Sequence, residues 1–199
     1  MLLDVQDAQL VLVDYQSKLM PAMHDAESVL RNGVRLAQIA HLLKVPTWGT
    51  EQNPERLGHN PTEISAVCRR TLAKMSFGAC EAGLAELLRP QAGAPSGNAR
   101  SLPRHLQKAV PAPARNSVVV AGCEAHVCLL QTALGLLEEE FDVWVVTDAC
   151  ASRTERNRDA AFDRLASAGA ELLTTEMVAF EWLRTAEHPQ FKAVQALIK

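Results

Sequence analysis

The stretch that most constrains the fold is residues 117–140, SVVVAGCEAHVCLLQTALGLLEEE. Residues 118–121 form an unbroken apolar run, which is typical of a strand buried on both faces of a parallel sheet. Gly122 ends this run, and from about His126 the apolar residues recur at three- and four-residue steps, as on one face of a helix. The stretch therefore predicts a strand, a tight turn and a helix.

Cys128 falls in the first turn of this predicted helix. The unpaired amides and the positive dipole end of a helix stabilise a thiolate, so they can lower the pKa of a cysteine below its free value of about 8.5. The alternative is a packing role, because free cysteine is among the most buried residue types. The position favours Cys128 as a candidate nucleophile.

Strand-like and helix-like segments alternate along the whole chain. Strands are predicted at 8–13, 45–50, 71–73, 118–121, 143–147 and 171–174, and helices at 25–44, 63–69, 82–88, 126–140, 155–169, 176–184 and 189–198. This alternation is typical of an α/β three-layer sandwich, in which a mainly parallel sheet carries helices on both faces. We expect a six-stranded sheet in a single domain that covers residues 1–199.

Residues 91–116 differ from their surroundings, because proline, glycine and alanine are frequent there and no apolar period is seen. Ser101 would cap a helical turn or two within residues 101–110. We interpret residues 91–116 as an insertion or lid within the domain.

The overall composition favours a soluble enzyme-like domain over several other classes. Hydrophobic residues make up 48% and charged residues 22% of the chain, and the formal net charge is −3 without a basic cluster, so nucleic acid is not an expected partner. No apolar run approaches the roughly 20 residues of a membrane span, and the start of the chain has no basic signal-peptide region. The five cysteines form neither a disulfide framework nor a zinc motif. We expect a cytoplasmic protein with reduced thiols, a small-molecule substrate and no cofactor.

Three predicted strand ends carry side chains that take part in catalysis in many enzymes: Asp14, Lys74 and the turn before Cys128. Ligands of parallel sheets bind beyond the carboxyl ends of the strands, so these groups could share one site. There Asp14 would act as a general base and Lys74 would offset negative charge. The amides of the turn at 122–125 would face the oxygen of a tetrahedral intermediate. Taken singly, an aspartate after a strand is often a helix cap or metal ligand, and a lysine is usually solvated.

The chain resembles the isochorismatase-like cysteine hydrolases, which include nicotinamidases and N-carbamoylsarcosine amidases. The segments that carry the resemblance are LVLVDYQSKLMPAM, TEQNPERLG, KMSF, VVVAGCEAHVCLLQTAL, VVTDACASR and HPQFKAVQALIK. The GCEAHVC and HPQFK segments are similar to the isochorismatase domain-containing branch, whose members have no assigned activity.

This resemblance implies a Rossmann-like, isochorismatase-like hydrolase fold and a catalytic triad of Asp14, Lys74 and Cys128. It places the oxyanion hole at the main-chain amides of Glu124 and Cys128. It also implies a cis non-proline peptide bond between Cys123 and Glu124, and assembly into dimers or larger homo-oligomers, with the amphipathic C-terminal helix as a contact surface.

One departure from the family concerns metal binding. Nicotinamidases bind a metal through an Asp-x-His motif after the second strand and a further histidine. Here that place reads Glu51-Gln52-Asn53, with His59 beyond it. Glu51 and His59 remain as candidate ligands of an ion. Asparagine is a poor replacement for an imidazole ligand of a transition metal, so we expect no functional metal and regard nicotinamide as a disfavoured substrate.

Three further residues are candidates for the substrate pocket. Gln16 and Gln52 would be neutral hydrogen-bonding groups at its rim. His126, one residue into the predicted helix, would contact substrate or else cap the helix.

The leading functional hypothesis is a metal-independent cysteine hydrolase that cleaves a small amide or related C–N bond through a thioester on Cys128. Family members that cleave a vinyl ether lack the cysteine, so its presence favours acyl chemistry. The alternatives are a non-catalytic binding or scaffold protein that keeps the fold, and a nicotinamidase-like, metal-assisted amidase. A nucleotide-binding module is disfavoured, because the first strand is followed by DYQSKL and not by a glycine-rich loop.

Overall fold

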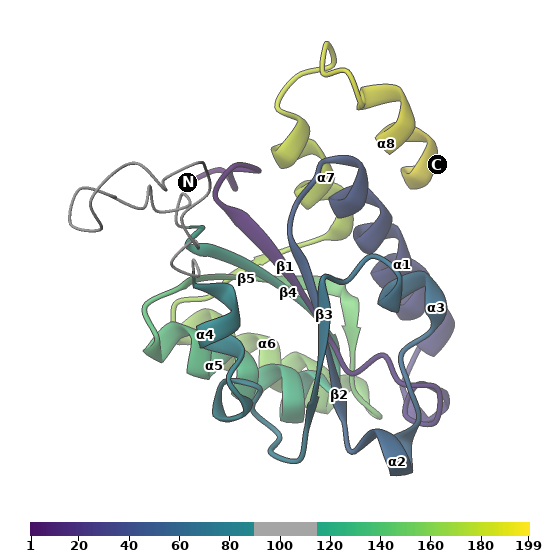
Figure 1. Cartoon of the computed structure of the whole chain (residues 1–199), viewed down its shortest axis with the longest axis vertical. Helices are drawn as coiled ribbons and strands as arrows, with labels where there is room; N and C mark the ends of the chain where they lie inside the picture. The colour runs from purple at the N-terminus through teal and green to yellow at the C-terminus, as the bar shows by residue number, and fades with distance from the viewer. Residues whose placement is uncertain (90–114) are drawn as a thin grey trace, which may run out of the picture.

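The computed structural model describes residues 1–89 and 115–199 (Figure 1). The predicted insertion or lid at 91–116, except for its last two residues, and the predicted turns at 101–110 lie outside the described residues.

In the described ranges, the strands form one six-stranded parallel sheet in the order β3-β2-β1-β4-β5-β6. The strands are β1 (Ala8–Val13), β2 (Thr47–Gln52), β3 (Arg70–Lys74), β4 (Ser117–Cys123), β5 (Asp142–Ala151) and β6 (Glu171–Leu173). Every residue of β1 and β4 is buried, which agrees with their mostly apolar sequences, in which Gln9 and Ser117 are the polar residues. The predicted α/β class with a six-stranded parallel sheet is confirmed.

Helices cover both faces of this sheet (Figure 1). One face carries α1 (Ala26–Leu42), α3 (Thr62–Ser65), α7 (Thr175–Leu183) and α8 (Phe191–Ile198), and the other carries α4 (Leu84–Leu88), α5 (Leu130–Glu138) and α6 (Glu155–Ser167). The short α2 (Pro54–Leu57) follows β2. None of the helices in the described part of the chain combines the length and the apolar character that crossing a bilayer requires.

Tyr15 and Gly33 fix the position of α1 next to the end of β1. The Tyr15 ring is fully buried, and its hydroxyl donates to the carbonyl of Ala149 in β5. A Cβ atom on Gly33 would lie 2.6 Å from this ring, so the helix approaches the ring closely only because residue 33 is glycine. This contact supports the segment that begins with Asp14.

The C-terminal helix α8 packs within the chain. Val194 is fully buried, and Phe191, Leu197 and Ile198 pack against the core. The guanidinium of Arg35 in α1 donates through Nε to the carbonyl of Leu197 at 2.6 Å. The apolar face that we predicted as a contact surface between subunits is therefore largely used inside the molecule.

Strand β5 is longer than its apolar run predicts. The sequence places its end at Asp148, whereas the strand continues to Ala151 after a register shift opposite Val120 and Gly122. Asp148 stays in the strand because its carboxylate accepts hydrogen bonds from the backbone and the hydroxyl of Thr175 at 2.8 and 2.9 Å. The prediction that Asp148 ends the strand was wrong.

Candidate active site

The carboxyl ends of three strands bring together the side chains that the sequence singles out. Asp14 directly follows β1, Lys74 ends β3, and Cys128 follows β4 after a short turn. The Lys74 ammonium lies 2.8 Å from Oδ2 of Asp14, and both side chains have no exposed surface. Cys128 lies close enough for both charges to act on its thiol. The site lies where the strand order changes direction, between β1 and β4.

The backbone at this point is held in uncommon conformations. Asp14 has a φ of 51°, a left-handed value that aspartate tolerates better than most residues. Gly122, which is paired with Val13, has a φ of 140°, and a Cβ atom there would lie 2.0 Å from the Val13 carbonyl oxygen. Glycine therefore allows β1 and the turn that leads to Cys128 to approach each other.

Both oxygens of the Asp14 carboxylate are hydrogen-bonded. Oδ1 accepts from the hydroxyl of Thr50 at 2.7 Å, and Oδ2 accepts from Lys74. Thr50 is fully buried on β2 and is paired in register with Val13. Our sequence analysis missed Thr50, although its place two residues before Gln52, on the same face of a strand that ends at the site, was a usable signal.

Lys74 has four acceptors around its ammonium. Asp14 Oδ2 and Gln52 Oε1 each lie at 2.8 Å and the Phe77 carbonyl at 3.0 Å, while the Ser76 carbonyl is more distant at 3.5 Å. The three short contacts match the three N–H donors of an ammonium group. The charge is thus fully paired and hydrogen-bonded, as a buried lysine requires.

Cys128 lies in a π-helical turn, Ala125–Leu129, that precedes α5. Its pKa is raised to about 12, first by burial and next by the negative charge of Asp14, while the positive charge of Lys74 acts in the opposite direction. The prediction of a lowered thiol pKa at a helix start was wrong, because burial outweighs the favourable contributions. The resting side chain is therefore a neutral thiol that needs a base.

One backbone feature of the turn between β4 and Cys128 agrees with the family resemblance. The Cys123–Glu124 peptide bond is cis. Among the described residues, no hydrogen bond is formed by the backbone N–H of Glu124. The Glu124 carboxylate accepts from Nε of Arg153 at 2.9 Å.

The three predicted pocket residues have different environments. Gln16 is fully buried, and its Nε2 donates to the carbonyls of Gln52 and Gly58. Gln52 is buried beside Lys74 and 4.0 Å from the Cys128 sulfur. His126 is half-buried, and its Nδ1 lies 2.9 Å from the Ser152 hydroxyl. Gln16 and Gln52 are therefore internal groups of the site and not groups at its rim.

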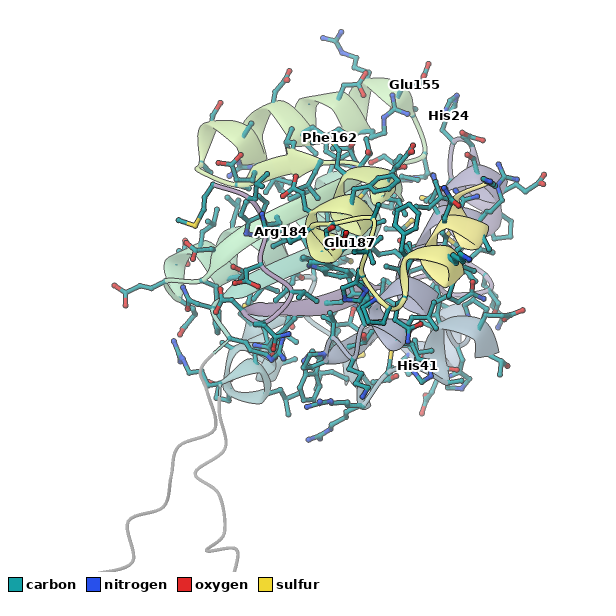
Figure 2. All side chains as sticks on the ribbon, turned by 90° about the horizontal axis from the view of Figure 1, so that it is seen from above. His24, His41, Glu155, Phe162, Arg184 and Glu187 are labelled. Atoms are coloured by element: carbon teal, nitrogen blue, oxygen red, sulfur yellow. The ribbon has the colours of Figure 1, made fainter. Side chains whose placement is uncertain are left out.

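The buried Ser152 also joins the His126 turn to the segment that contains His24. The carbonyl of Ser152 accepts from the backbone of His24 at 2.9 Å. The His24 ring approaches Glu155, at the start of α6, to 4.0 Å (Figure 2).

Glu51 and His59, which we considered as metal ligands, form a pair with each other. Nδ1 of His59 lies 2.9 Å from one oxygen of Glu51, and the other oxygen accepts from the Asn60 backbone at 2.8 Å. Glu51 lies on the strand between Thr50 and Gln52, so its side chain points away from the face that holds Asp14. In residues 1–89 and 115–199, no three His, Cys, Asp or Glu side chains are grouped to hold a metal ion.

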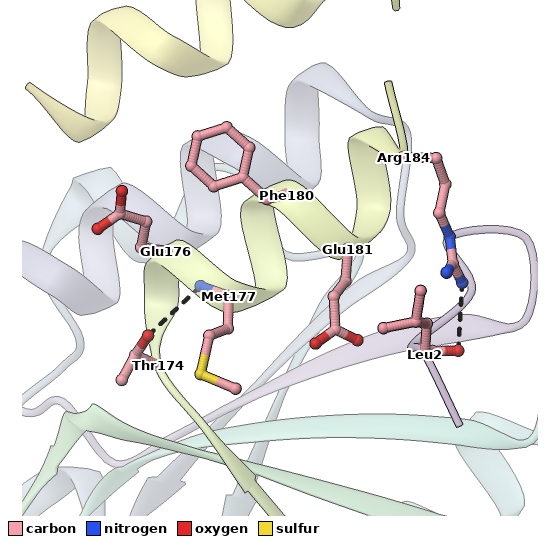
Figure 3. A pocket seen from close by; sticks show the side chains of 7 residues that line it. All are labelled: Leu2, Thr174, Glu176, Met177, Phe180, Glu181 and Arg184. Atoms are coloured by element: carbon pink, nitrogen blue, oxygen red, sulfur yellow. Dashed lines mark hydrogen bonds between the residues drawn. The ribbon is translucent and has the colours of Figure 1, made fainter. Parts of the chain in front are cut away.

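A hollow of about 440 Å³ lies elsewhere on the molecule, between α7 and the start of the chain (Figure 3). Its apolar lining includes Met177 and Phe180, and Arg184 donates to the carbonyl of Leu2. Leu2 precedes β1 and Cys128 follows β4, so this hollow and the candidate site lie at opposite ends of the parallel strands.

Fold and site together define a class: a parallel α/β protein with a cysteine, a lysine and an aspartate gathered at the switch point of its sheet. Residues 8–177 match the Isochorismatase domain. Isochorismatase domain-containing protein 2A from Mus musculus is 36% identical over 190 residues, which cover 96% of this chain and 82% of that protein. The chain belongs to the isochorismatase-like hydrolase family, and the resemblance inferred from its motifs is confirmed.

Solved structures of similar proteins agree with this assignment. The MAR1 ribonuclease from Caenorhabditis elegans has a TM-score of 0.83 at 29% identity, over 100% of this chain and 92% of that chain. The YcaC gene product of Escherichia coli, described as an octameric hydrolase of unknown specificity, has a TM-score of 0.78 at 26% identity, over 98% and 88% of the two chains.

Proposed function

We propose that this protein is a metal-independent cysteine hydrolase that cleaves a small amide or a related C–N bond through a thioester on Cys128. The observation that carries the proposal is the buried Asp14–Lys74 pair beside a neutral, buried thiol. A neutral thiol is a weak nucleophile, and a carboxylate beside it is the base that would activate it.

In the first half of the reaction, Asp14 takes the proton of Cys128 while the sulfur attacks the substrate carbonyl carbon. The backbone N–H groups of Glu124 and Cys128 donate to the oxygen, which gains negative charge in the tetrahedral intermediate. Asp14 then gives the proton to the departing nitrogen, the C–N bond breaks, and an amine or ammonia leaves a thioester behind.

In the second half, Asp14 removes a proton from a water molecule, which attacks the thioester carbonyl. The C–S bond breaks, the carboxylic acid leaves, and the sulfur regains a proton. Lys74 remains an ammonium throughout and offsets the charge that moves between Asp14 and Cys128. The net reaction is amide plus water giving acid plus amine.

We assign supporting roles to the neighbouring polar residues. Thr50 fixes the second oxygen of Asp14, and Gln16 ties the loop after β1 to the loop after β2. His126 is the pocket residue that we retain as a substrate contact, since it is half-buried and its ring is oriented by Ser152.

Two observations favour the metal-independent reaction over a metal-assisted, nicotinamidase-like one. The place of the family's Asp-x-His motif reads Glu51-Gln52-Asn53, so an asparagine stands where the family has a histidine ligand, and asparagine is a weaker ligand than an imidazole. The remaining candidates, Glu51 and His59, are hydrogen-bonded to each other. A cytoplasmic location is part of the proposal, and it fits the five free cysteines of the chain.

We also propose that identical chains assemble into an oligomer. Support comes from the octameric E. coli relative and from large apolar side chains that one chain leaves exposed, among them Met177 and Phe180. Native mass spectrometry should then give a multiple of the 21.7 kDa chain, and a monomer at micromolar concentration would contradict this assembly.

The test is a screen of small primary amides, N-carbamoyl compounds and ureas, with released ammonia as the readout. We expect turnover in the wild type, loss of turnover to background in Cys128→Ala, and a loss of about 10²-fold or more in Asp14→Asn. A labelled single-stranded RNA belongs in the same screen, because the nematode relative is described as a ribonuclease. RNA cleavage that depends on Cys128, or amide turnover that survives Cys128→Ala, would overturn the proposal.

A further inference from the structure

We infer that Arg153 is a positioning residue of this site: it holds the carboxylate of Glu124 and so sets the direction of the Glu124 backbone N–H. The inference rests on the proposed function, in which this N–H and that of Cys128 donate to the oxygen of the tetrahedral intermediate. Donors of this kind act because they are in place before the negative charge develops. A residue that keeps one of them in place contributes to the rate without contacting the substrate.

The irregular pairing of β4 and β5 brings Arg153 to the turn before Cys128. Between the pairs Val120–Val145 and Gly122–Cys150, β4 advances by two residues and β5 by five. Bulges and related irregularities are frequent next to active sites, where they redirect side chains. The residues that follow β5 therefore lie beside the residues that follow β4.

Arg153 binds Glu124 through two donors. Its side-chain Nε lies 2.9 Å and its backbone nitrogen 3.3 Å from the same carboxylate oxygen, Oε2. The Glu124 side chain is only 12% exposed, whereas that of Arg153 is 61% exposed. A charge-assisted hydrogen bond to a carboxylate that is largely removed from water is stronger than an ion pair between two solvated groups. This contact therefore fixes the Glu124 side chain.

The backbone of Glu124 is held on its other side by the helix that follows. Its carbonyl accepts from the N–H groups of Val127 at 3.0 Å and Leu129 at 3.2 Å, the two chain neighbours of Cys128. With its carboxylate bound on one side and its carbonyl on the other, Glu124 keeps one backbone conformation, with φ −81° and ψ 140°. The Glu124 N–H then points in one direction, as an oxyanion donor must.

The backbone that carries Arg153 is itself fixed. The preceding residue, Ser152, is fully buried, its hydroxyl lies 2.9 Å from Nδ1 of His126, and its carbonyl accepts from the backbone of His24 at 2.9 Å. Two consecutive residues of one segment thus contact two residues of the turn. Because the Arg153 side chain is exposed and its backbone is held by Ser152, its replacement should release Glu124 without unfolding the protein.

The experiment follows acetylation of Cys128 by p-nitrophenyl acetate before the steady state, over a range of ester concentrations. It gives a maximal acylation rate and a half-saturating concentration. In Arg153→Met we expect the maximal rate to fall by about tenfold or more, because small misplacements of catalytic groups cost up to about 10²-fold. The half-saturating concentration should change by less than about twofold, as expected when an interaction made only in the transition state is weakened.

Two further measurements identify a positioning role. The denaturant midpoint of Arg153→Met should equal that of wild type, since the replaced side chain is exposed. Arg153→Lys keeps the positive charge and the backbone donor, so it should recover part of the acylation rate that Arg153→Met loses.

A double-mutant cycle links the effect to Glu124. In Glu124→Gln, the side chain keeps its length but loses the charge that binds Arg153, so the acylation rate should also fall. Once this pair is broken, a second substitution has nothing left to break, so the double variant Glu124→Gln/Arg153→Met should be no slower than Arg153→Met alone. Independent losses that multiply in the double variant would overturn the inference.

Arg89→Met is the matched control. Arg89 is also an exposed arginine paired with a glutamate, Glu139, at 2.6 Å. The carbonyl of the preceding Leu88 accepts from Gln9 at the start of β1, so Arg89 lies at the opposite end of the sheet from Cys128. The acylation rate of Arg89→Met should equal that of wild type.

A wild-type acylation rate in Arg153→Met would overturn the inference. So would a change confined to the half-saturating concentration, which would make Arg153 a substrate contact. If Arg153→Met does not fold, Glu124→Gln decides alone, and a rate equal to that of wild type counts against the inference.

Alkylation of Cys128 by iodoacetamide separates this inference from the proposed function. Alkylation displaces iodide and forms no oxyanion, so Arg153→Met should alkylate as fast as wild type. Equal losses in acylation and alkylation would show that Arg153 acts on the thiol, against the inference. If Cys128→Ala releases p-nitrophenol as fast as wild type, the proposed site itself is refuted. If Cys128→Ala is inactive while Arg153→Met keeps the full rate, only the role of Arg153 is wrong.

Discussion

The acidity of the Cys128 thiol beside Asp14 and Lys74 depends on its three-dimensional surroundings, which cannot be read directly from the sequence. The motif and the strand ends were enough to select these three residues, and the structure brings them together. The direction of the Cys128 pKa was not predictable, because burial by side chains distant in sequence outweighs the local effect of a helix start. Resting thiol chemistry in this protein is therefore set by tertiary packing.

Thr50 provides the residue-scale prediction. Thr50→Val keeps the shape of the side chain but removes the donor to Oδ1 of Asp14, which leaves a carboxylate oxygen without a partner in a fully buried place. The free energy of unfolding should fall by about 1–3 kcal/mol. Denaturant titration measures this change.

Thr50→Ser is the control for this prediction, because it keeps the hydroxyl donor and loses only a methyl group. It should retain most of the stability that Thr50→Val loses. Equal losses in the two variants would show that packing of the methyl group, and not the hydrogen bond to Asp14, accounts for the effect.

At the scale of elements, the sequence predicted where strands and helices lie more reliably than how they end. The bounds of β1 and the extent of α1 follow from their apolar patterns. The end of β5 does not follow from its apolar pattern, because hydrogen bonds from Thr175 keep Asp148 inside the strand. The π-helical turn before α5 was also not predicted, since the spacing of its apolar residues is that of an ordinary α-helix.

The packing of α1 on Tyr15 gives the element-scale prediction. Gly33→Ala would normally favour a helix by up to about 1 kcal/mol. Here the added methyl group would lie 2.6 Å from the buried Tyr15 ring. We expect a net loss of about 1–3 kcal/mol in unfolding free energy, as for overpacking of a core.

Gly135→Ala in α5 is the matched comparison, since its Cβ would meet the side chain of the half-buried Cys80 at 3.1 to 3.2 Å. The Cys80 side chain can move by a few tenths of an ångström, so the loss of unfolding free energy should be smaller than for Gly33→Ala. A stabilised Gly33→Ala protein would contradict the packing that we describe around Asp14.

For the whole molecule, the cysteines predict a loss of stability in alkaline solution. Burial is the main cause that raises the pKa of each thiol: Cys68, Cys128 and Cys150 to about 12, Cys80 to about 11, and Cys123 well above its usual range. In the unfolded chain these thiols ionise near pH 8.5, so above that pH the unfolded state binds fewer protons than the folded state. Their contribution to stability is therefore full below about pH 8.5 and declines up to the folded pKa values.

Denaturant midpoints between about pH 8 and about pH 11 measure this loss, which amounts to at most about 1.4 kcal/mol per pH unit for each fully buried thiol. Cys150→Ala, which removes one fully buried thiol, should flatten the dependence relative to wild type. A wild-type protein whose stability is constant across this range, under reducing conditions, would show that the thiols are not buried as described.

Both the family and the parallel α/β architecture could be predicted from the sequence, because contiguous motifs indicate the family and apolar runs indicate the strands. The hydrogen-bond network of the site was not, since Thr50 meets Asp14 and Gln52 meets Lys74 only through the register of neighbouring strands, and Gln16 joins the network by binding Gln52. The packing of α8 on α1 also depends on the complete fold.

The most direct test of the central claim is to trap the acyl group on the sulfur. The protein is mixed with p-nitrophenyl acetate, quenched in acid at successive times, and analysed by intact and peptide mass spectrometry. We predict an acetyl thioester on Cys128 with release of p-nitrophenol, absent in Cys128→Ala and slowed in Asp14→Asn. Acetylation of lysines alone, or equal p-nitrophenol release from wild type and Cys128→Ala, would contradict a Cys128-centred hydrolase.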